Sequence, residues 1–332
     1  MRPAQAGPLG TSMNVLRPAA ETPLDRAKFQ NPDVTAKGEP RAFIAATRLA
    51  VLWFNTGTLC NLTCDHCYIE SSPKNDRLAY LSLAEVTGYL DEIGANRMDT
   101  EEIGFTGGEP FMNPDLVAMM EMALERGFRV LVLTNAMRPM MKCADRLAGL
   151  VARHGEKLVV RVSLDHYSAS LHESLRGAHS WRRTLDGIRW LVETGATLHI
   201  AGRTCWGDSE DRMREGYARL FEAEGIPVDA GDRTALTLFP EMDETQDVAE
   251  ITTGCWDVLG IAPEAMMCAT SRMVVKHKGE DRPVMVPCTL LPYDRQFDMG
   301  HDIADAMTPV KLNHPHCARF CVLGGGSCSH AG

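Results

Sequence analysis

Residues 60–67 read CNLTCDHC and follow the apolar run LAVLWF of residues 49–54, so three cysteines come soon after a buried strand. A tetrahedral zinc site or a fully ligated iron–sulfur cube needs four protein ligands. Three closely spaced thiolates, Cys60, Cys64 and Cys67, instead suit a [4Fe–4S] cluster whose fourth iron stays open to a small molecule. The spacing therefore predicts such a cluster after the first strand, and a zinc knuckle or buried structural thiols are the alternatives.

The composition is that of an ordinary globular protein. Of 332 residues, 45% are apolar and 23% charged, and 34 basic against 44 acidic residues give a net charge of −10. So acidic a chain has no overall attraction for nucleic acid or anionic membranes. No apolar stretch reaches the roughly 18 residues of a spanning helix. Because the N-terminus lacks a compact apolar signal region, we expect a cytoplasmic protein.

The first three quarters of the chain consist of two regions with different sequence patterns. Residues 1–44 are rich in Pro, Ala, Thr and charged side chains without periodicity, which predicts a partly disordered N-terminal arm. From residue 45 to about 245, short apolar runs alternate with amphipathic stretches, which predicts alternating strands and helices. The expected strands are 49–55, 102–106, 129–134, 158–164, 197–202 and 234–239.

The expected helices follow these strands one by one. They are 82–94 with a capping box at Ser82 and Glu85, 113–127 with Asn113 as N-cap, 141–154, 181–194 and 209–224. Six β/α repeats with continuously apolar strands imply a parallel sheet covered on both faces. The fold class is therefore α/β, and the count fits a partial (β/α)6 TIM-like barrel, in which chemistry sits at the C-terminal ends of the strands.

The alternation stops after about residue 250. Residues 272–276 and 283–287 flank the turn KGED at 278–281, which predicts a β-hairpin with Cys268 and Cys288 at its feet. Six of the eleven cysteines lie between Cys255 and Cys328, and nothing in the sequence suggests export to an oxidising compartment. We therefore expect residues 250–332 to form a small cysteine-rich hairpin and loop domain that binds metal.

A second motif, GGEP at residues 107–110, follows the strand that ends at Thr106. Two glycines at a strand end let the backbone approach a ligand closely and leave carbonyl groups available for hydrogen bonds. Together, CxxxCxxC and the GGEP segment one β/α unit later resemble the signature of the radical S-adenosylmethionine (radical SAM) superfamily. The resemblance covers about residues 45–330 and makes residues 45–245 the radical SAM core.

The resemblance implies an enzyme with two cofactors, a [4Fe–4S] cluster and SAM. The open iron would bind the amino and carboxylate groups of SAM, and the segment Gly107, Gly108, Glu109, Pro110 would accept hydrogen bonds from that amino group. An electron from the cluster would cleave SAM to a 5′-deoxyadenosyl radical, which abstracts hydrogen from a substrate. A low-potential donor such as flavodoxin or ferredoxin is the implied electron source.

Three further residues end the later strands or follow them. Asn135 ends the third strand and Ser163 the fourth, and Arg176 lies in the stretch LHESLRG at 171–177. Taken singly they fit an asparagine turn, a strand-end serine and a solvated arginine. The resemblance places the asparagine near the SAM ribose and the serine and arginine at the SAM carboxylate, to which a guanidinium offers two parallel donors.

The C-terminal cysteines resemble the SPASM or Twitch extension of radical SAM enzymes, which holds auxiliary [4Fe–4S] clusters. A full SPASM domain has seven cysteines and two clusters, and Twitch holds one cluster. We prefer one cluster bound by four of Cys268, Cys288, Cys317, Cys321 and Cys328, with Cys255 as a further candidate and a second cluster left open. A zinc ribbon is the alternative.

The resemblance leaves the reaction and the substrate open. Oxidation of a substrate radical would make the protein a dehydrogenase, and attack on that radical would make it a cross-linking maturase of ribosomal peptides. Only about 45 residues precede the first strand, which tilts the expectation toward a small molecule or a short protein segment. A non-catalytic iron–sulfur or zinc regulator is the alternative of another class. No catalytic acid or base is assigned; Cys205, Glu241 and Asp243 are candidates at the strand ends.

Overall fold

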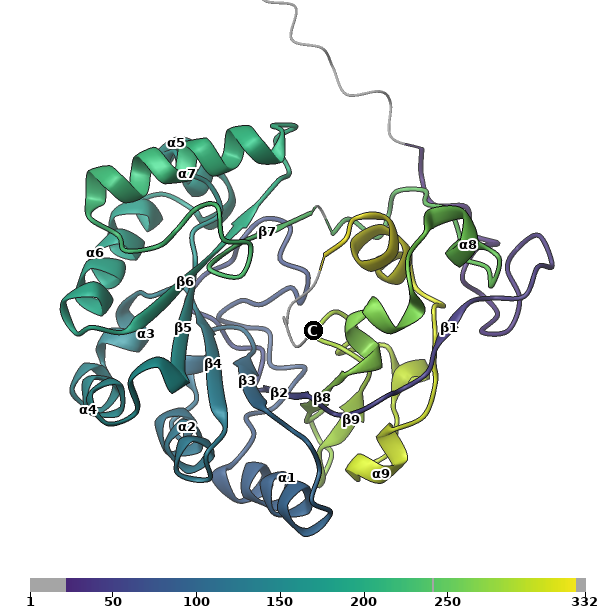
Figure 1. The fold of residues 1–332 in the computed structure, drawn as a ribbon, viewed down its shortest axis with the longest axis horizontal. Coiled ribbons are helices and arrows are strands. Elements are labelled where there is room, and N and C mark those ends of the chain that lie inside the picture. Colours follow the sequence, from purple (N-terminus) through teal and green to yellow (C-terminus); the bar gives the residue numbers. More distant parts are fainter. Residues whose placement is uncertain (1–21, 241, 327–332) are drawn as a thin grey trace, which may run out of the picture.

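The computed structural model describes residues 22–240 and 242–326, and its centre is a curved sheet of eight strands in the order β7-β6-β5-β4-β3-β2-β8-β9 (Figure 1). Strands β2 to β7 are parallel, and each pairs with the next along the chain. The predicted partial (β/α)6 barrel is confirmed. The bounds are β2 (Val51–Asn55), β3 (Glu102–Thr106), β4 (Arg129–Thr134), β5 (Leu158–Ser163), β6 (Thr197–Arg203) and β7 (Leu236–Phe239).

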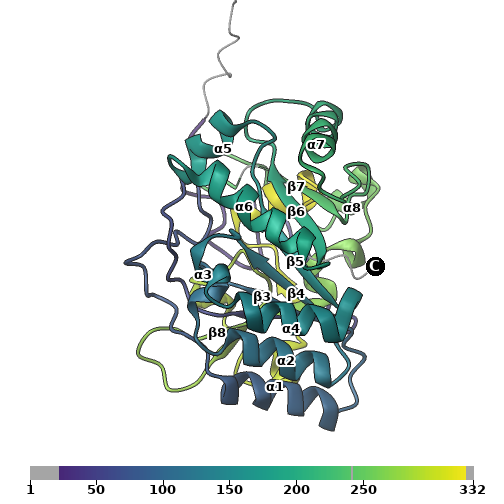
Figure 2. The same cartoon turned by 90° about the vertical axis from the view of Figure 1, so that its left-hand side faces the viewer.

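Helices α1, α2, α4, α6 and α7 connect consecutive strands, and Figure 2 shows α1, α2, α4 and α6 side by side on one flank of the sheet. The predicted capping box is confirmed: Ser82 Oγ accepts from the Glu85 backbone N–H at 3.3 Å, and the Glu85 carboxylate accepts from the Ser82 N–H at 2.8 Å. The bounds are α1 (Leu83–Ala95), α2 (Leu116–Glu125), α4 (Ala144–His154), α6 (Ser180–Glu193) and α7 (Glu210–Glu224).

The predicted start of the second helix was wrong. Asn113 ends the short 3-10 turn Pro110–Met112, and its side-chain amide donates to the carbonyls of Thr56 and Leu81 at 3.1 and 2.8 Å. This amide is therefore used to hold the loop after β2, and α2 begins three residues later.

Two short helices also differ from the sequence expectation. The expected helix 141–154 is split into α3 (Arg138–Met141) and α4, with Cys143 as the residue before α4. The segment after β5 forms α5 (Ala169–Arg176), which was not expected as a helix. Both α3 and α5 directly follow the strand ends where the candidate site residues lie.

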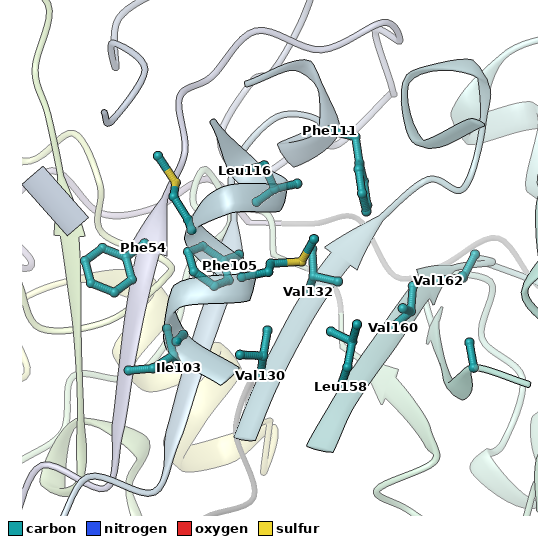
Figure 3. Close-up of a cluster of buried hydrophobic side chains, with 14 of the residues drawn as sticks. Phe54, Ile103, Phe105, Phe111, Leu116, Val130, Val132, Leu158, Val160 and Val162 are labelled. Atoms are coloured by element: carbon teal, nitrogen blue, oxygen red, sulfur yellow. The ribbon is translucent and has the colours of Figure 1, made fainter. Parts of the chain in front are cut away.

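Alternation along the strands divides the core into two layers. Phe54 of β2, Ile103 and Phe105 of β3, and Val130 and Val132 of β4 face the helices, as Figure 3 shows around α2. Their neighbours on the other face belong to a second buried cluster with residues from the C-terminal part of the chain, among them Val51, Trp53, Leu131, Val159, Met273 and Phe320. Burial on both faces explains why these strands read as continuous apolar runs.

The predicted hairpin is present, and it lies on the sheet itself. β8 (Ser271–Val275) pairs with β2 in parallel, and β9 (Val284–Val286) pairs with β8 antiparallel. The cysteine-rich segment therefore extends the barrel sheet beyond its first strand. The other elements of this part are α8 (Cys255–Leu259), α9 (Ile303–Ala306), β10 (Val310–Lys311) and a π-helix (Cys317–Leu323).

The described part of the expected N-terminal arm is packed rather than loose. β1 (Phe43–Ile44) pairs with β10, and Arg41, 2% exposed, forms an ion pair of 2.6 Å with Glu250. A buried arginine needs such a partner, so residues 22–44 are held against the C-terminal segment; residues 1–21 lie outside the described residues. Among the described helices, none combines the length and apolarity that crossing a membrane requires.

Candidate functional site

One cavity lies at the C-terminal ends of the parallel strands, and the cysteine loop after β2 forms one of its walls. Parallel strands present all their C-terminal ends on one rim, which is why residues from five different strands converge there. The strand-end residues that line the cavity are Thr106, Gly107, Gly108, Leu133, Thr134, Asn135, Ser163, Ala201, Gly202, Arg203 and Phe239. Cys60, Cys64 and Cys67 line the same cavity.

Backbone contacts fix the cysteine loop to its surroundings. The N–H of Cys60 donates to the Ser72 carbonyl at 3.1 Å, and the N–H of Asp65 donates to the Leu175 carbonyl of α5 at 2.8 Å. His66 adopts a left-handed conformation with φ of 57°, and its carbonyl accepts from Arg203 Nη1 at 3.3 Å. The loop is thus tied at both ends and in the middle, which holds three thiols around one side of the cavity.

Burial and a nearby arginine act in opposite directions on the charge of these thiols. Burial raises the pKa of the Cys60 thiol to about 12. Burial also raises the pKa of Cys64, although the Arg176 guanidinium opposes this shift. Iron ligation requires thiolates, so cluster binding would displace these protons. An arginine beside the thiols favours the charged ligands that a cluster needs.

Gly107 and Gly108 let the end of β3 approach the loop that leads to Cys60. A Cβ on Gly107, whose φ is 147°, would lie 2.5 Å from the Gly57 carbonyl oxygen. The N–H of Gly108 donates to that same oxygen at 2.9 Å. The two glycines therefore hold the cysteine loop by direct backbone contact, and Gly107 and Gly108 also face the cavity.

We expect Gly108→Ala to weaken this contact, because the added Cβ would lie 2.3 Å from the Leu59 carbonyl oxygen and 2.6 Å from that of Thr58. Overpacking against backbone costs about 1–3 kcal/mol, so both the free energy of unfolding and the iron retained after reconstitution should fall. Gly88→Ala in α1 is the matched control, since its Cβ meets no atom within 4 Å among the described residues. Equal iron content and equal thermal stability in the two variants would contradict this role.

Glu109 does not line the cavity, although the resemblance grouped it with the SAM contacts. Its carboxylate is buried and accepts hydrogen bonds from Thr134 Oγ1 and the Asn135 N–H, both at 2.8 Å, and from the Phe111 N–H at 3.2 Å. Burial raises the pKa of Glu109 to about 7. In this structure Glu109 links the end of β3 to the end of β4, and it thereby positions residues that line the cavity.

Asn135, for which the resemblance predicts a ribose contact, lines the cavity just after the end of β4. Its side-chain amide donates to Asn61 Oδ1 at 2.9 Å, and its Oδ1 accepts from the Met137 N–H at 3.1 Å. The residue therefore connects the end of β4 to the cysteine loop while lining the cavity. Thr134 beside it also lines the cavity, and the sequence reasoning did not select it.

Arg176 and Ser163 face the same cavity, and Asp165 lies between them along the chain. Arg176 Nε donates to Asp165 Oδ2 at 2.5 Å, and Nη2 donates to Oδ1 at 3.0 Å. Asp165 thus takes one pair of parallel donors, the Nε N–H and one N–H of Nη2. A guanidinium has five N–H donors, so the N–H groups of Nη1 and the second N–H of Nη2 are left for a ligand carboxylate.

The Asp165–Arg176 pair is buried, so its electrostatics are strong. Burial alone would raise the pKa of Asp165, but the Arg176 guanidinium outweighs burial and holds it below the ordinary value. His172, one turn before Arg176 on α5, accepts from the Asp165 backbone N–H through Nδ1 at 3.3 Å. The first turn after β5 and the helix α5 therefore fix the guanidinium in place at the cavity.

Part of the cavity wall is apolar, and the sequence alone did not predict the residues that form it. Phe239 at the end of β7 and Phe320 of the π-helix stack with ring centroids 5.8 Å apart, and both line the cavity. Leu290 follows the hairpin and lines the cavity too. The cysteine-rich segment therefore supplies part of the cavity wall.

The described C-terminal cysteines lie in or against one buried cluster. Cys288 and Cys317 are buried, and Cys255, Cys268 and Cys321 pack against the same core. Burial raises the pKa of Cys317 to about 12, and the nearby Cys268 adds to that shift. Cys255 begins α8, where its sulfur accepts from the Thr252 N–H at 3.3 Å; Cys328 lies outside the described residues.

Arg272 is a buried cation beside these thiols. It is 1% exposed and donates to the carbonyls of Ala306, Ser271 and Thr308 at 2.6, 2.7 and 3.1 Å. Burial lowers its pKa, while the Cys268 and Cys288 thiols oppose that shift. Among the described residues no carboxylate pairs with it, so a set of thiolates with negative charge fits this position.

The thiols do not form a closed zinc site. Tetrahedral zinc with Zn–S distances of about 2.3 Å brings ligand sulfurs within about 4 Å of one another. In the described ranges the only three ligating groups with their atoms within 4.8 Å are Glu244, His314 and His316. There His314 Nδ1 accepts from the His316 N–H at 3.1 Å, which puts its proton on Nε2, facing Glu244 at 3.4 Å. That group is hydrogen-bonded rather than arranged to ligate.

Two of the three weaker candidates at the strand ends do not line the cavity. Neither Cys205 nor Asp243 is among the described residues that line it, and Asp243 instead accepts from the Thr245 N–H at 2.8 Å. Glu241 lies outside the described residues. Met242, beside them, does line the cavity.

Comparison with known proteins gives matches to both the sequence and the fold. Residues 54–213 match the family model described as "Radical SAM superfamily". The "Antilisterial bacteriocin subtilosin biosynthesis protein AlbA" of Bacillus subtilis (strain 168) is 27% identical over 273 residues, which are 77% of this chain and 58% of that protein. The "Mycofactocin maturase MftC" of Mycobacterium ulcerans (strain Agy99) is 31% identical over 136 residues, 41% of this chain and 34% of that protein.

This chain therefore spans less than two thirds of the length of these curated relatives. Among solved structures, Streptococcus suis SuiB bound to precursor peptide SuiA is similar, with a TM-score of 0.56 and 12% identity over 77% of this chain and 63% of that one. At that identity the likeness is one of fold, and it agrees with the partial barrel described above.

Proposed function

Because residues 54–213 form a domain of the radical SAM superfamily, we propose that this protein is an enzyme that cleaves SAM reductively and modifies a peptide. Radical SAM domains use a [4Fe–4S] cluster and SAM. In this proposal Cys60, Cys64 and Cys67 hold the cluster, and the neighbouring strand ends hold SAM. The observation that carries it is the single cavity that these thiols share with Gly107, Gly108, Asn135, Ser163 and Arg176.

Each side chain then has a task that its position supports. The Arg176 guanidinium, kept in place by Asp165, presents Nη1 to the SAM carboxylate, and Ser163 adds a hydroxyl beside it. Gly107 and Gly108 expose backbone to the SAM amino group because no side chain intervenes. Asn135, just after the end of β4, would contact the SAM ribose. When bound, the cluster supplies the electron that cleaves SAM, and the 5′-deoxyadenosyl radical removes hydrogen from the substrate.

A peptide is the substrate class that we favour, whereas the sequence alone tilted toward a small molecule or a short protein segment. AlbA is named for bacteriocin biosynthesis, MftC is named a maturase, and SuiB is bound to a precursor peptide in its structure. The apolar wall with Phe239, Leu290 and Phe320 suits an apolar or aromatic side chain. Because the C-terminal segment supplies Phe320, this segment would select the substrate.

We further propose that the C-terminal cysteines bind one auxiliary [4Fe–4S] cluster, in the manner of SPASM or Twitch domains. Cys268, Cys288, Cys317 and Cys321 are its described candidate ligands, and Cys328 and Cys255 are the others. Arg272 supports this assignment, since a buried guanidinium among carbonyls and thiols would be balanced by a cluster of thiolates. Such a cluster would accept the electron that is released when a substrate radical is oxidised, or would bind the substrate directly.

The test is anaerobic reconstitution with iron and sulfide, followed by assay with dithionite and SAM. We expect 5′-deoxyadenosine, and a mass change in a short peptide encoded beside the gene. No 5′-deoxyadenosine from a protein carrying its full iron complement would refute the enzyme proposal and favour a non-catalytic regulator. Cleavage of SAM without change in any such peptide, but with conversion of a small metabolite, would refute the peptide substrate alone.

A further inference from the structure

A second groove lies next to the cysteine loop, outside the cavity. Asn61, the residue after Cys60, lines this groove, whereas Cys60 itself lines the cavity. The groove has an apolar floor that includes Met137, and three cations border it: Arg138, Lys142 and Arg183. None of the described residues that line it is acidic. The cysteine loop therefore separates the cavity, whose lining includes acidic and basic side chains, from a groove whose charged lining residues are all basic.

These three cations share one groove. All are exposed, and none has an ion-pair partner among the described residues. Other arginines of this flank are paired: Arg153 of the neighbouring helix α4 pairs with Glu121, and Arg189 farther along α6 pairs with Glu224. In a chain with a net charge of −10, unpaired positive charge collects at the ends of α3 and α6 that border the cluster loop.

The elements that carry the cations form one surface. α3 contacts α6 in the structure, and both lie on the flank of the sheet drawn in Figure 2. Thr184 Oγ1 in the first turn of α6 donates to the Asn135 carbonyl at 3.3 Å. Gly187 packs so closely on the Ala136 carbonyl that a Cβ would lie 1.8 Å from its oxygen. The spacing of the cations around the groove is therefore fixed by tight packing against the end of β4.

We propose that this groove is the docking site of an acidic, low-potential electron-transfer protein that reduces the cluster. The proposal rests on the proposed function, because only a cluster that turns over needs an electron in each cycle. One electron passes from the reduced donor to the oxidised cluster, and no bond forms or breaks. SAM and substrate fill the cavity during turnover, so an electron must arrive from another side of the loop.

The path from groove to cluster is short and fixed. Asn61 borders the groove and is bonded in sequence to Cys60, and its side chain is held by the Asn135 amide at 2.9 Å. A substrate peptide bound in the groove would instead lie on the wrong side of the loop from the cavity. A cluster of exposed cations attracts an acidic partner protein, and the rate at which the two associate then depends on ionic strength.

The experiment compares two triple variants with the same change in charge. Arg138→Glu, Lys142→Glu and Arg183→Glu alter the groove, and Lys37→Glu, Arg97→Glu and Lys157→Glu alter exposed cations elsewhere. Each holoenzyme is assayed for SAM cleavage with dithionite and, separately, with a photoreduced bacterial flavodoxin over a range of concentration and salt. Binding of flavodoxin is measured by calorimetry without SAM.

We expect equal dithionite-driven rates in the wild type and both variants. With flavodoxin, the groove variant alone should show a KM raised about tenfold or more and a loss of the salt dependence. Equal flavodoxin binding and KM in the two variants would overturn the docking site. So would a groove variant that binds flavodoxin normally but loses affinity for the substrate peptide.

The same measurements separate this inference from the proposed function. If wild-type holoenzyme makes no 5′-deoxyadenosine with dithionite, the proposed function fails. Flavodoxin binding that is lost only in the groove variant would still support the docking site in that case.

Discussion

Cys64→Ala is expected to abolish SAM cleavage and to lower the iron content by about four atoms per chain. Cys64 lines the cavity together with Arg176 and the other two thiols of the motif, and backbone hydrogen bonds fix the loop that carries it. No other described cysteine lines that cavity, so none stands ready to replace it. Iron and sulfide analysis together with the 5′-deoxyadenosine assay checks both parts of this expectation.

Two further variants serve as controls for the Cys64→Ala result. Cys205→Ala should keep its iron and its rate, because Cys205 is not among the described residues lining the cavity. A variant with Cys60, Cys64 and Cys67 all replaced by alanine should retain about four iron atoms per chain if the C-terminal cysteines hold an auxiliary cluster. Full activity of Cys64→Ala would contradict the cluster assignment, and an iron-free triple variant would contradict the auxiliary cluster.

Arg176→Met should weaken SAM binding by about ten- to a hundredfold, since a hydrogen bond to a charged group contributes about 1.5–3 kcal/mol. The same change should lower the free energy of unfolding by about 3–5 kcal/mol, because it leaves the Asp165 carboxylate, 3% exposed, without its partner. SAM binding by equilibrium dialysis and unfolding by denaturant measure the two effects separately.

The double variant Asp165→Asn with Arg176→Met distinguishes binding from stability. Removing both charges should restore most of the lost stability, since no buried charge stays unpaired. It should not restore SAM affinity, because the guanidinium is still missing. Recovery of SAM binding in the double variant would show that Arg176 acts only by holding the fold together.

The pair also predicts a dependence of stability on pH. Arg176 outweighs burial and holds the pKa of Asp165 below its ordinary value, so the stabilisation is complete above the ordinary aspartate pKa of about 3.9. It is lost as the pH falls through the lower pKa of the folded state. Unfolding curves of wild type and of the double variant should therefore converge on acidification in that range.

Much of the fold could be read from the sequence because its signals are local. The apolar runs at the strands, the Ser82 and Glu85 capping box and the spacing of Cys60, Cys64 and Cys67 each lie within a few residues. The glycines at 107 and 108 mark a close approach that needs no other residue to be recognised. Parallel strands then bring such local signals to one rim, which is why the site could be placed before the structure was known.

The features that the sequence did not predict depend on contacts with residues far away in the chain. Asn113 has the right type for a helix cap, and its Oδ1 accepts from the Asp115 N–H at 2.9 Å. Its amide also donates to the carbonyls of Thr56 and Leu81, which lie far back in the chain, and the helix begins only at Leu116. The hairpin could be foreseen from its own pattern, whereas its pairing with β2 joins residues more than two hundred positions apart. Packing energy between distant segments decides such choices, and no local pattern records it.

By itself the sequence determined that three thiols follow the first strand of a parallel barrel and that GGEP ends the second. Only the tertiary structure decided how the polar groups around them are used. Glu109 is turned to the end of β4, Asp165 takes two donors of Arg176, and Phe320 closes the cavity from the C-terminal segment. The physical reason is that a buried charge or polar group must have a hydrogen-bonding or ionic partner. The tertiary structure, and not the spacing of residues in the sequence, determines which partner lies within reach.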